Sequence, residues 1–173
     1  MVVMTKQPDH SSAPVLRWTS GDPQAAALIL QATARSVLAR GHEELWPPDT
    51  LTVDALAQDY PADGWQVAWQ GEAPVGCFVL MDPDPVFWAE KPRGEALYLH
   101  KLAVHPQAQG QGLNRALLDR AEELTRAAGR RWLRLDTDVT RPKLQALYTE
   151  FGFDTVDRQR VMGFEVFRYE KEV

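Results

Sequence analysis

Apolar residues recur every three to four positions in several stretches of the chain, a spacing that places them on one face of a helix. The clearest series runs through Leu113, Leu117, Ala121 and Leu124. Capping residues, prolines and glycines at the borders indicate where such helices begin and end. The predicted helices run from Pro23 to about Gly41 and over Val53–Asp59, Gly112–Ala128 and Arg141–Phe151.

Shorter apolar runs bounded by turn residues predict strands. The run Leu97–Val104 is interrupted only by His100 and Lys101, so we expect a central strand that is buried on both faces. Strands that interleave with helices in this order predict a mixed α/β sheet with helices on both faces. The other predicted strands cover Val15–Thr19, Trp65–Gln70, Val75–Met81, Trp132–Thr137, Phe153–Asp157 and Gly163–Glu170.

Length and composition narrow the class of protein. The 173 residues suit a single domain, predicted over 15–173, after a polar arm at 1–14. The net charge of -5 and the lack of a basic cluster argue against a nucleic-acid partner. No apolar run approaches the ~20 residues of a membrane span, and the first residues do not resemble a signal peptide. We therefore expect no membrane partner. Cys77 is the only cysteine, so we expect no disulfide within the chain and a cytoplasmic location.

The stretch from Leu99 to Arg115 joins the central strand to a helix through a glycine-containing turn. Gly110 and Gly112 carry no Cβ, so a ligand can approach the backbone closely there. The free N–H groups of the following helix turn, together with its dipole, form a site suited to an anion. A pyrophosphate over Gln109–Asn114 is one interpretation of this pattern, and a plain turn is the other.

Two motifs in this half of the chain resemble those of the GNAT superfamily of N-acetyltransferases. Gln109–Asn114 is similar to the acetyl-CoA-binding motif Arg/Gln-x-x-Gly-x-Gly/Ala, with Asn114 in place of the final Gly or Ala. Leu144–Phe153 is similar to a second motif, in which a Leu-Tyr pair precedes Gly-Phe. The resemblance implies a GNAT-like fold with a mixed, mostly antiparallel sheet. It also implies acetyl transfer from acetyl-CoA to a primary amine, on a small molecule or a protein, by direct attack in a ternary complex.

The resemblance further implies which residues bind the cosubstrate. The backbone of the central strand would pair with the pantetheine arm, and the glycine loop would hold the pyrophosphate. Arg141 stands where many relatives carry an asparagine that contacts the pantetheine. Arg115 would reach a phosphate or pair with Asp119 on a solvated face. The residues expected at acetyl-CoA are Leu102, Ala103, Val104, Gln109, Gly110, Gln111, Gly112, Leu113, Asn114, Arg115, Arg141 and Tyr148.

Two residues are candidates for the chemistry. Tyr148 matches the tyrosine of the Leu-Tyr pair and would donate a proton to the departing thiolate, although an ordinary core tyrosine is the alternative. His100 is the nearest titratable group on the central strand for the role of general base. By alternation His100 shares a face with Leu102, unless a bulge breaks the register. Asp136, Asp138 and a chain of water molecules are the other candidates for the base.

The resemblance implies that the acceptor site lies between the first two helices and the last hairpin. Carboxylates beside tryptophan suit a cationic amine through charge and cation–π contact, and a solvated loop with one buried anchor is the alternative. The residues expected there are Glu43, Glu44, Trp46 and Trp88, with His42, Asp49 and Arg160 nearby.

Other interpretations of the chain stay open. The departures at Asn114 and Arg141 favour a non-catalytic acyl-CoA-binding module, and a generic nucleotide-binding α/β protein is a third hypothesis. The four histidines show no metal-ligand spacing, so no metal site is predicted. Cys77 is interpreted as a buried packing residue, because a catalytic role would require a covalent acetyl-enzyme. The exposed edge of the last hairpin is a candidate contact for a homodimer.

Overall fold

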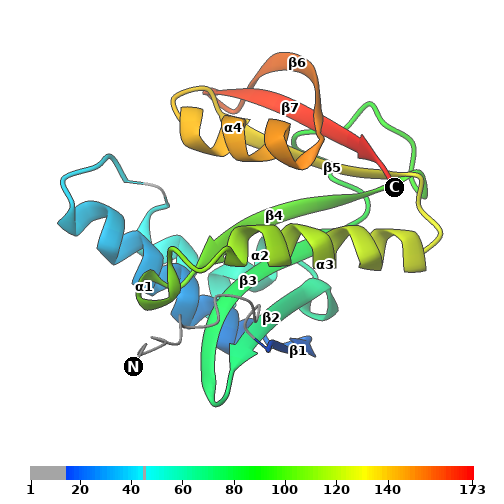
Figure 1. Ribbon diagram of the computed structural model, residues 1–173. Coiled ribbons are helices and arrows are strands. Elements are labelled where there is room, and N and C mark those ends of the chain that lie inside the picture. Colours follow the sequence, from blue (N-terminus) through cyan, green and yellow to red (C-terminus); the bar gives the residue numbers. More distant parts are fainter. Residues whose placement is uncertain (1–14, 45) are drawn as a thin grey trace, which may run out of the picture.

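A computed structural model describes residues 15–44 and 46–173 as one mixed sheet with helices on both faces (Figure 1). The arm predicted at 1–14 lies outside the described residues. The strand order is β1-β2-β3-β4-β5-β7-β6, and every neighbouring pair is antiparallel except β4 and β5. The elements are β1 (Arg17–Ser20), α1 (Pro23–Ala39), α2 (Val53–Asp59), β2 (Trp65–Gln70), β3 (Ala73–Met81), β4 (Ala96–Val104), α3 (Leu113–Ala127), β5 (Trp132–Asp138), α4 (Pro142–Phe151), β6 (Asp154–Val161) and β7 (Phe164–Glu172).

Local capping explains why the predicted helices begin and end close to where they were expected. The Asp22 side chain accepts a hydrogen bond from the Ala25 N–H at 3.0 Å and so caps α1. The Thr52 hydroxyl caps α2 in the same way. Gly152, with φ of +99°, ends α4 in the left-handed conformation that glycine adopts without strain.

The last hairpin is longer than predicted. β6 reaches Val161, beyond the expected end at Asp157, because it stays paired with β7 as far as Phe164. Its second half carries Arg158 and Arg160, both exposed, on the outermost strand of the sheet. An edge strand that is largely solvated lacks the apolar alternation on which the prediction depended. The hairpin is therefore an exposed edge, as predicted, while dimer formation stays a prediction.

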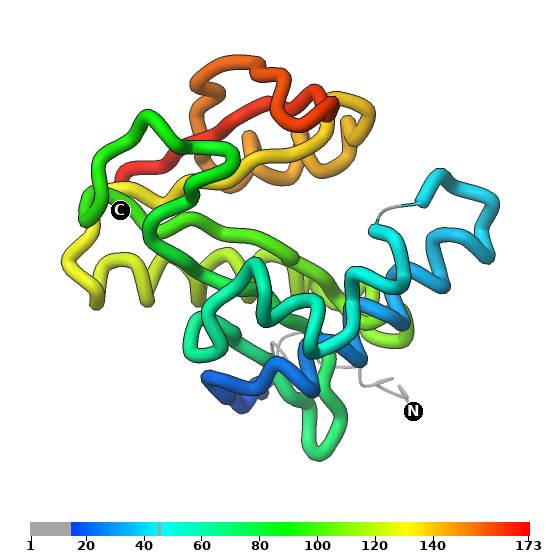
Figure 2. Tube along the Cα trace, turned by 180° about the vertical axis from the view of Figure 1, so that it is seen from behind, coloured from blue at the N-terminus to red at the C-terminus, as the bar shows by residue number. Residues whose placement is uncertain are grey.

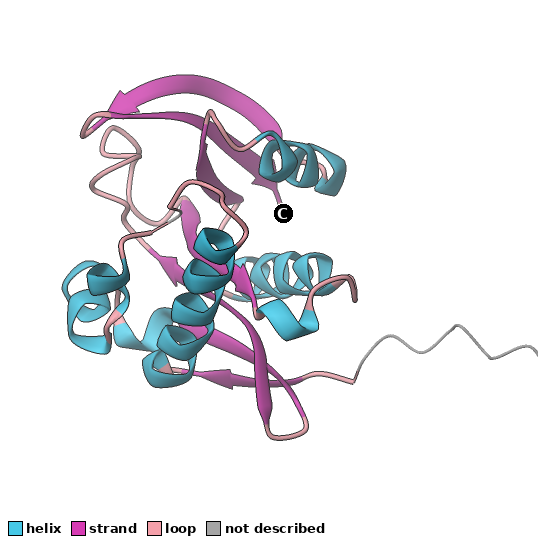
Figure 3. Cartoon of the chain, turned by 90° about the vertical axis from the view of Figure 1, so that its left-hand side faces the viewer, coloured by secondary structure: helices cyan, strands magenta, loops and turns pink. Residues whose placement is uncertain are grey.

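The two larger hydrophobic cores lie on opposite faces of the sheet. Helices α1 and α2 cover one face, around Ile29, Val67 and Val79. Helices α3 and α4 cover the other, around Leu117 and Leu135. Figure 1 shows α3 and α4 in front, Figure 2 shows the chain from behind with α1 and α2 in front, and Figure 3 shows helices on both sides of the strands. Within the described residues, no helix is long and apolar enough to cross a membrane.

The central strands β4 and β5 are paired over only a short length. Ala96–Tyr98 pairs with Trp132–Arg134, whereas β4 continues to Val104 and β5 to Asp138. Within the described residues, the β5-facing edge of 99–104 therefore has no strand partner. The two strands diverge beyond the paired residues (Figure 1), and we call the region between 99–104 of β4 and 135–138 of β5 the wedge.

A β-bulge interrupts the alternation of side chains that was expected along β4. The register with β3 shifts between Cys77 and Val79, and Lys101 adopts a left-handed φ of +56°. Leu102 packs on the α3 side of the sheet, whereas His100 contacts the Tyr60 ring on the α2 side. His100 and Leu102 therefore do not share a face, and the bulge is the physical reason.

Candidate active site

The glycine loop that precedes α3 has the geometry of an anion site. Gly110 and Gly112 have φ of +82° and +73°, and a Cβ on either would meet no protein atom within 4 Å. Gly112 is the N-cap of α3 and provides no side-chain cap, so the first helical N–H groups stay available to a ligand. Arg40 donates to the Gln109 side chain at 3.2 Å, and Gln70 donates to that of Gln111 at 2.9 Å. These two hydrogen bonds link the loop to the residue that follows α1 and to β2.

The side chains at the start of α3 leave that N-terminus open. Asn114 is exposed, so its bulk does not fill the space above the helix. The Arg115 guanidinium carbon lies 5.4 Å from the centroid of the Phe151 ring on α4. Within the described residues Arg115 forms no ion pair with Asp119, so the solvated pairing expected as an alternative is absent.

The wedge leads from the glycine loop toward the centre of the sheet. Leu102, Ala103 and Val104 lie on its β4 side, where the backbone edge has no strand partner within 15–44 and 46–173. Leu102 and Val104 belong to the α3-side core, and Ala103 to the α1-side core. Their side chains are thus structural, and their backbone is the part that a ligand in the wedge would meet.

Tyr148 lies on α4 and is 5% exposed. Its ring packs against Phe153 and Tyr169 with centroids 5.9 and 5.8 Å away. Burial raises the pKa of Tyr148 above its usual value of 10, and the nearby Asp136 carboxylate raises it further. The phenol therefore keeps its proton at neutral pH, which is the form that a general acid needs.

His100 forms a buried dyad with Asp84, a residue of the β3–β4 loop. The Asp84 Oδ2 lies 2.8 Å from the His100 Nε2, and Asp84 also accepts hydrogen bonds from the Val86 and Phe87 N–H groups. Burial by itself raises the pKa of Asp84, but the hydrogen bond and charge of His100 and the two N–H groups hold it below its usual value. Because an ionised Asp84 can only accept a hydrogen bond, the hydrogen between the two groups belongs to the His100 Nε2. The His100 Nδ1 is then the nitrogen that can accept a proton.

Asp136 faces the other nitrogen of the imidazole. Its Oδ1 lies 3.8 Å from the His100 Nδ1 and has no hydrogen-bond partner among the described residues. Burial raises the pKa of Asp136 to about 6, which the neighbouring His100 opposes. Asp138 is differently placed, because its Oδ1 accepts hydrogen bonds from the N–H and the hydroxyl of Thr140. Of the two aspartates predicted as alternative bases, only Asp136 lies beside His100.

The tertiary structure gathers potential metal ligands that sequence spacing did not reveal. Ligand atoms of Asp84, His100 and Asp136 lie within 4.8 Å of one another. The 2.8 Å contact between Asp84 and His100 has the length of a charge-assisted hydrogen bond, and we interpret the group as a proton-handling cluster.

The bulge in β4 places the Lys101 side chain beside this cluster. Its Nζ lies 4.9 Å from the Trp46 ring centroid and 5.8 Å from that of Tyr60, which also packs on His100 at 5.7 Å. Burial lowers the pKa of Lys101 to about 8, although Asp59 and Asp136 oppose that effect. Sequence reasoning missed Tyr60 and Asp84 and noted Lys101 only as a break in an apolar run, because no local pattern links these residues.

The residues predicted for the acceptor are only partly brought together. Trp46 lies against Lys101, and Glu43 and Glu44 are exposed in the loop after α1. Arg141 donates to both glutamate backbone carbonyls, at 3.5 and 3.4 Å, and so links this loop to the start of α4. Trp88 makes different contacts, because it is 1% exposed and packs against Tyr98 and the guanidinium of Arg168.

Cys77 lies in β3 on the α1 side and is fully buried. Its Sγ is 3.8 Å from the Lys101 carbonyl oxygen and 3.9 Å from that of Ala26. Burial raises the pKa of the Cys77 thiol above its usual value, which removes the thiolate that a covalent mechanism requires. This environment agrees with the interpretation of Cys77 as a buried packing residue.

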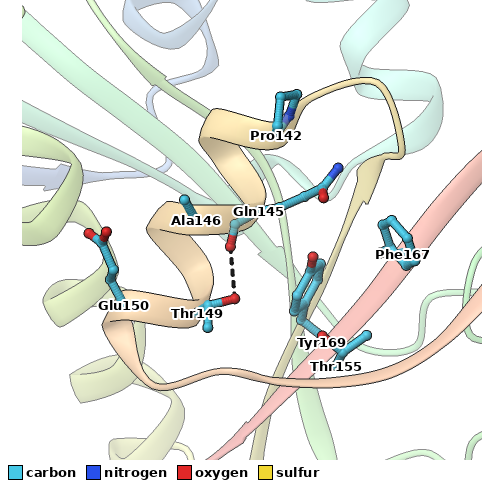
Figure 4. A pocket seen from close by; sticks show the side chains of 8 residues that line it. All are labelled: Pro142, Gln145, Ala146, Thr149, Glu150, Thr155, Phe167 and Tyr169. Carbon is cyan, nitrogen blue, oxygen red and sulfur yellow. Dashed lines mark hydrogen bonds between the residues drawn. The ribbon is translucent and has the colours of Figure 1, made fainter.

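A separate hollow of about 530 Å³ lies between α4 and the last hairpin. Figure 4 shows Gln145 on α4 beside Phe167 and Tyr169 on β7. None of the residues predicted to bind acetyl-CoA or the acceptor lines it. The lining residues are Pro142, Gln145, Ala146, Thr149, Glu150, Thr155, Phe167 and Tyr169.

Known proteins share both the fold and part of the sequence. Mycothiol acetyltransferase of Beutenbergia cavernae is 38% identical over 69 residues, which cover 40% of this chain and 23% of that relative's length. The ribosomal-protein-S18-alanine N-acetyltransferase of Escherichia coli matches with a TM-score of 0.68 at 18% identity, covering 92% of this chain and 94% of that one. YncA of Salmonella typhimurium, solved with its cofactor acetyl-CoA, matches with a TM-score of 0.63 at 18% identity, covering 91% and 93%.

The family match spans both motifs. Residues 32–153 match the acetyltransferase (GNAT) family, a range that runs from α1 to the end of α4 and includes the glycine loop and Tyr148. The fold expected from the resemblance is confirmed by the structural neighbours. The chain therefore belongs to the GNAT family of acetyltransferases.

Proposed function

We propose that this protein transfers an acetyl group from acetyl-CoA to a primary amine by direct attack in a ternary complex. The observation that carries the proposal is the wedge between β4 and β5, with an open helix N-terminus at one end. His100 of β4 and Asp136 of β5 face each other across it at 3.8 Å, and Tyr148 packs in the same core as Leu102 and Leu135 on its two sides. Acetyl-CoA or CoA is named with two structural neighbours, YncA and a Thermoplasma acidophilum acetyltransferase. Among the relatives, the ribosomal-protein-S18-alanine enzyme is named for an amine acceptor on a protein.

In this proposal the glycine loop and the start of α3 bind the pyrophosphate, mainly through the N–H groups of Gly112–Asn114. The pantetheine arm lies along the free edge of β4 and pairs with its backbone as an added strand would. The thioester is thereby held beside the acceptor amine, which converts a bimolecular reaction into one between bound groups.

The chemistry follows from the protonation states of the two candidate residues. The neutral amine nitrogen attacks the thioester carbonyl carbon, and the C–S bond then breaks. Tyr148 donates its proton to the departing thiolate, while His100 accepts the amine proton on Nδ1. The imidazolium formed in this way is stabilised by Asp84 and Asp136, which face its two nitrogens at 2.8 and 3.8 Å.

The first test compares Tyr148→Phe with Tyr169→Phe, a neighbouring buried tyrosine that serves as the control. We expect Tyr148→Phe to lower turnover by about 10²-fold or more, in the range of general acid catalysis, with little change in acetyl-CoA affinity. Tyr169→Phe should retain turnover. Acetyl-CoA binding is measured by calorimetry with ATP and NAD as competitors, and turnover by release of free thiol across a panel of small amines and peptide N-termini.

The same assay separates the alternatives. Binding of acetyl-CoA without turnover in the wild-type protein would favour the non-catalytic acyl-CoA-binding module. Equal affinity for ATP or NAD would favour a general nucleotide-binding protein. To test the general base, we expect the His100→Gln variant to lose most of its activity at low pH and to regain it as pH rises. At high pH the acceptor amine loses its proton to solvent and no longer needs a general base. The same pattern in Asp136→Asn, with His100→Gln fully active, would assign the base to Asp136 instead.

A further inference from the structure

Lys101 has a strained backbone in the middle of the wedge. It is one of two non-glycine residues with positive φ in the described part of the chain, and it lies within the unpaired length of β4. Strain of this kind is unfavourable and persists where the surrounding structure enforces it, often at functional sites. The bulge places the Lys101 side chain on the same face as His100, toward Tyr60.

The ammonium group of Lys101 is held by aromatic rings. Within residues 15–44 and 46–173 no carboxylate lies within ion-pair distance of its Nζ, which instead faces Trp46 and Tyr60. Lys171, by contrast, pairs with Glu122 at 2.6 Å, and Lys143 is exposed. Burial without a counter-ion favours the neutral amine of Lys101, which is the nucleophilic form.

The groups around Lys101 are those that the proposed reaction uses. Lys101 lies in the unpaired length of β4, and its Nζ faces Trp46, a residue expected at the acceptor site. Asp136 acts electrostatically on Lys101, on His100 and on the Tyr148 hydroxyl, so all three groups lie near this carboxylate. Asp59 at the end of α2 is the other acidic group that acts on Lys101. A thioester lying in the wedge beside Tyr148 would thus have the Lys101 amine on its acceptor side.

We propose that Lys101 is a self-acetylation site, modified by acetyl-CoA bound to the same chain when no acceptor amine is present. The proposal rests on the proposed function, since it needs acetyl-CoA in the wedge. The Lys101 Nζ lone pair attacks the thioester carbonyl carbon, a C–N bond forms and the C–S bond breaks. Tyr148 protonates the departing thiolate, and the proton lost from Nζ passes to His100 or water. The products are an Nζ-acetyl-lysine amide and free CoA.

Acetylation of Lys101 removes a charge that has no carboxylate partner within ion-pair distance among the described residues. A neutral amide removes the desolvation cost of a charge buried between Trp46 and Tyr60. The added acetyl group also takes up space on the face where the acceptor is expected. Acetylated protein should therefore turn over acceptor amines more slowly than unmodified protein.

The experiment incubates the purified protein with acetyl-CoA that carries a deuterated acetyl group, in the absence of an acceptor. Digestion at glutamate and mass spectrometry then measure labelling at each lysine. We expect Lys101 to be labelled at least tenfold faster than Lys143 or Lys171, and desulfo-CoA to suppress the labelling of Lys101 alone. Lys101→Arg should lose this label, and the matched control Lys143→Arg should retain it.

Calorimetry on the same sample separates the two proposals. If acetyl-CoA binds but Lys101 is labelled no faster than Lys143, self-acetylation is overturned and the proposed function stands. If Lys101 is labelled equally with and without desulfo-CoA, the modification comes from solution chemistry and the inference is again wrong. If acetyl-CoA does not bind, both proposals are overturned.

Discussion

Burial shifts Lys101 and Tyr148 toward their uncharged forms, and both shifts suit acyl transfer. It lowers the pKa of the lysine to about 8 and raises that of the tyrosine above 10. A neutral amine is a nucleophile, and a neutral phenol is a proton donor. Tyr148 was predicted from its place in a Leu-Tyr pair, whereas the environment of Lys101 depends on Trp46 and Tyr60, which belong to other elements.

The buried charge of Lys101 predicts a pH-dependent stability. Between pH 8 and 10.5 the unfolded chain holds a proton that the folded chain has lost, so the free energy of unfolding contributed by Lys101 rises with pH across this window. The pKa difference from 10.5 to about 8 corresponds to about 3 kcal/mol. The stability advantage of Lys101→Met over wild type should be largest below pH 8 and shrink toward pH 10.5.

Urea unfolding of both proteins at pH 7, 8.5 and 10 measures this difference. The control is Lys143→Met, which removes an exposed lysine from α4 and should give a small and constant difference. A difference for Lys101→Met that does not change with pH would show that the buried charge carries no such cost.

Among the secondary-structure elements, helix α3 has two ends with different roles. Gly112 begins it with φ of +73° and Gly129 follows its end with φ of +68°, and a Cβ added to either glycine would meet no protein atom within 4 Å. The predicted helix limits were accurate because both glycines act through local backbone geometry. Only the N-terminal end faces the wedge and the proposed pyrophosphate.

Replacing each glycine by alanine separates stability from binding. Both Gly112→Ala and Gly129→Ala place a Cβ in a left-handed conformation, which costs about 1 kcal/mol or more. Gly112→Ala should also weaken acetyl-CoA binding at least tenfold, because the methyl group enters the space above the helix N-terminus. Gly129→Ala should keep wild-type affinity. Chemical unfolding and calorimetry measure the two effects, and equal affinities would argue against a phosphate site at Gly112.

The sheet consists of two parts, β1–β4 and β5–β7, which are joined by the short pairing of β4 with β5. The buried side chain of Arg134 stabilises this junction. Arg134 is 2% exposed and lies opposite Tyr98 in the last pair before the wedge opens. It donates hydrogen bonds to the Glu170 and Glu95 carboxylates at 3.0 and 3.1 Å and to the Tyr98 hydroxyl at 3.3 Å. This one side chain therefore links β5 to β4 and β7 where the sheet begins to divide.

Arg134→Met should destabilise the fold by about 2–4 kcal/mol, because two partly buried carboxylates lose their partner. Arg131→Met is the matched control, since Arg131 and its partner Glu172 are 66% and 61% exposed. Such a surface pair contributes about 1 kcal/mol or less. The free energies of unfolding of the two variants test the difference, and equal losses would contradict a bracing role for Arg134.

Local sequence patterns were enough to predict the helices, most of the strands, the glycine loop and the position of Tyr148 on a helix. Helix periodicity, capping by Asp22 and Thr52, and the loop Gln109–Asn114 are features of contiguous residues, whose chemistry acts over one or two turns. The family match over residues 32–153 confirmed what these local features implied about the fold.

The surroundings of His100, by contrast, are formed by tertiary contacts. Its partner Asp84 lies 16 positions away in the β3–β4 loop, and Asp136 lies on β5. The bulge at Lys101 depends on the register between β3 and β4, and a shift of one residue moves a side chain to the other face. These contacts join elements that are distant in the chain, so no local pattern encodes them, and they form only when the sheet assembles.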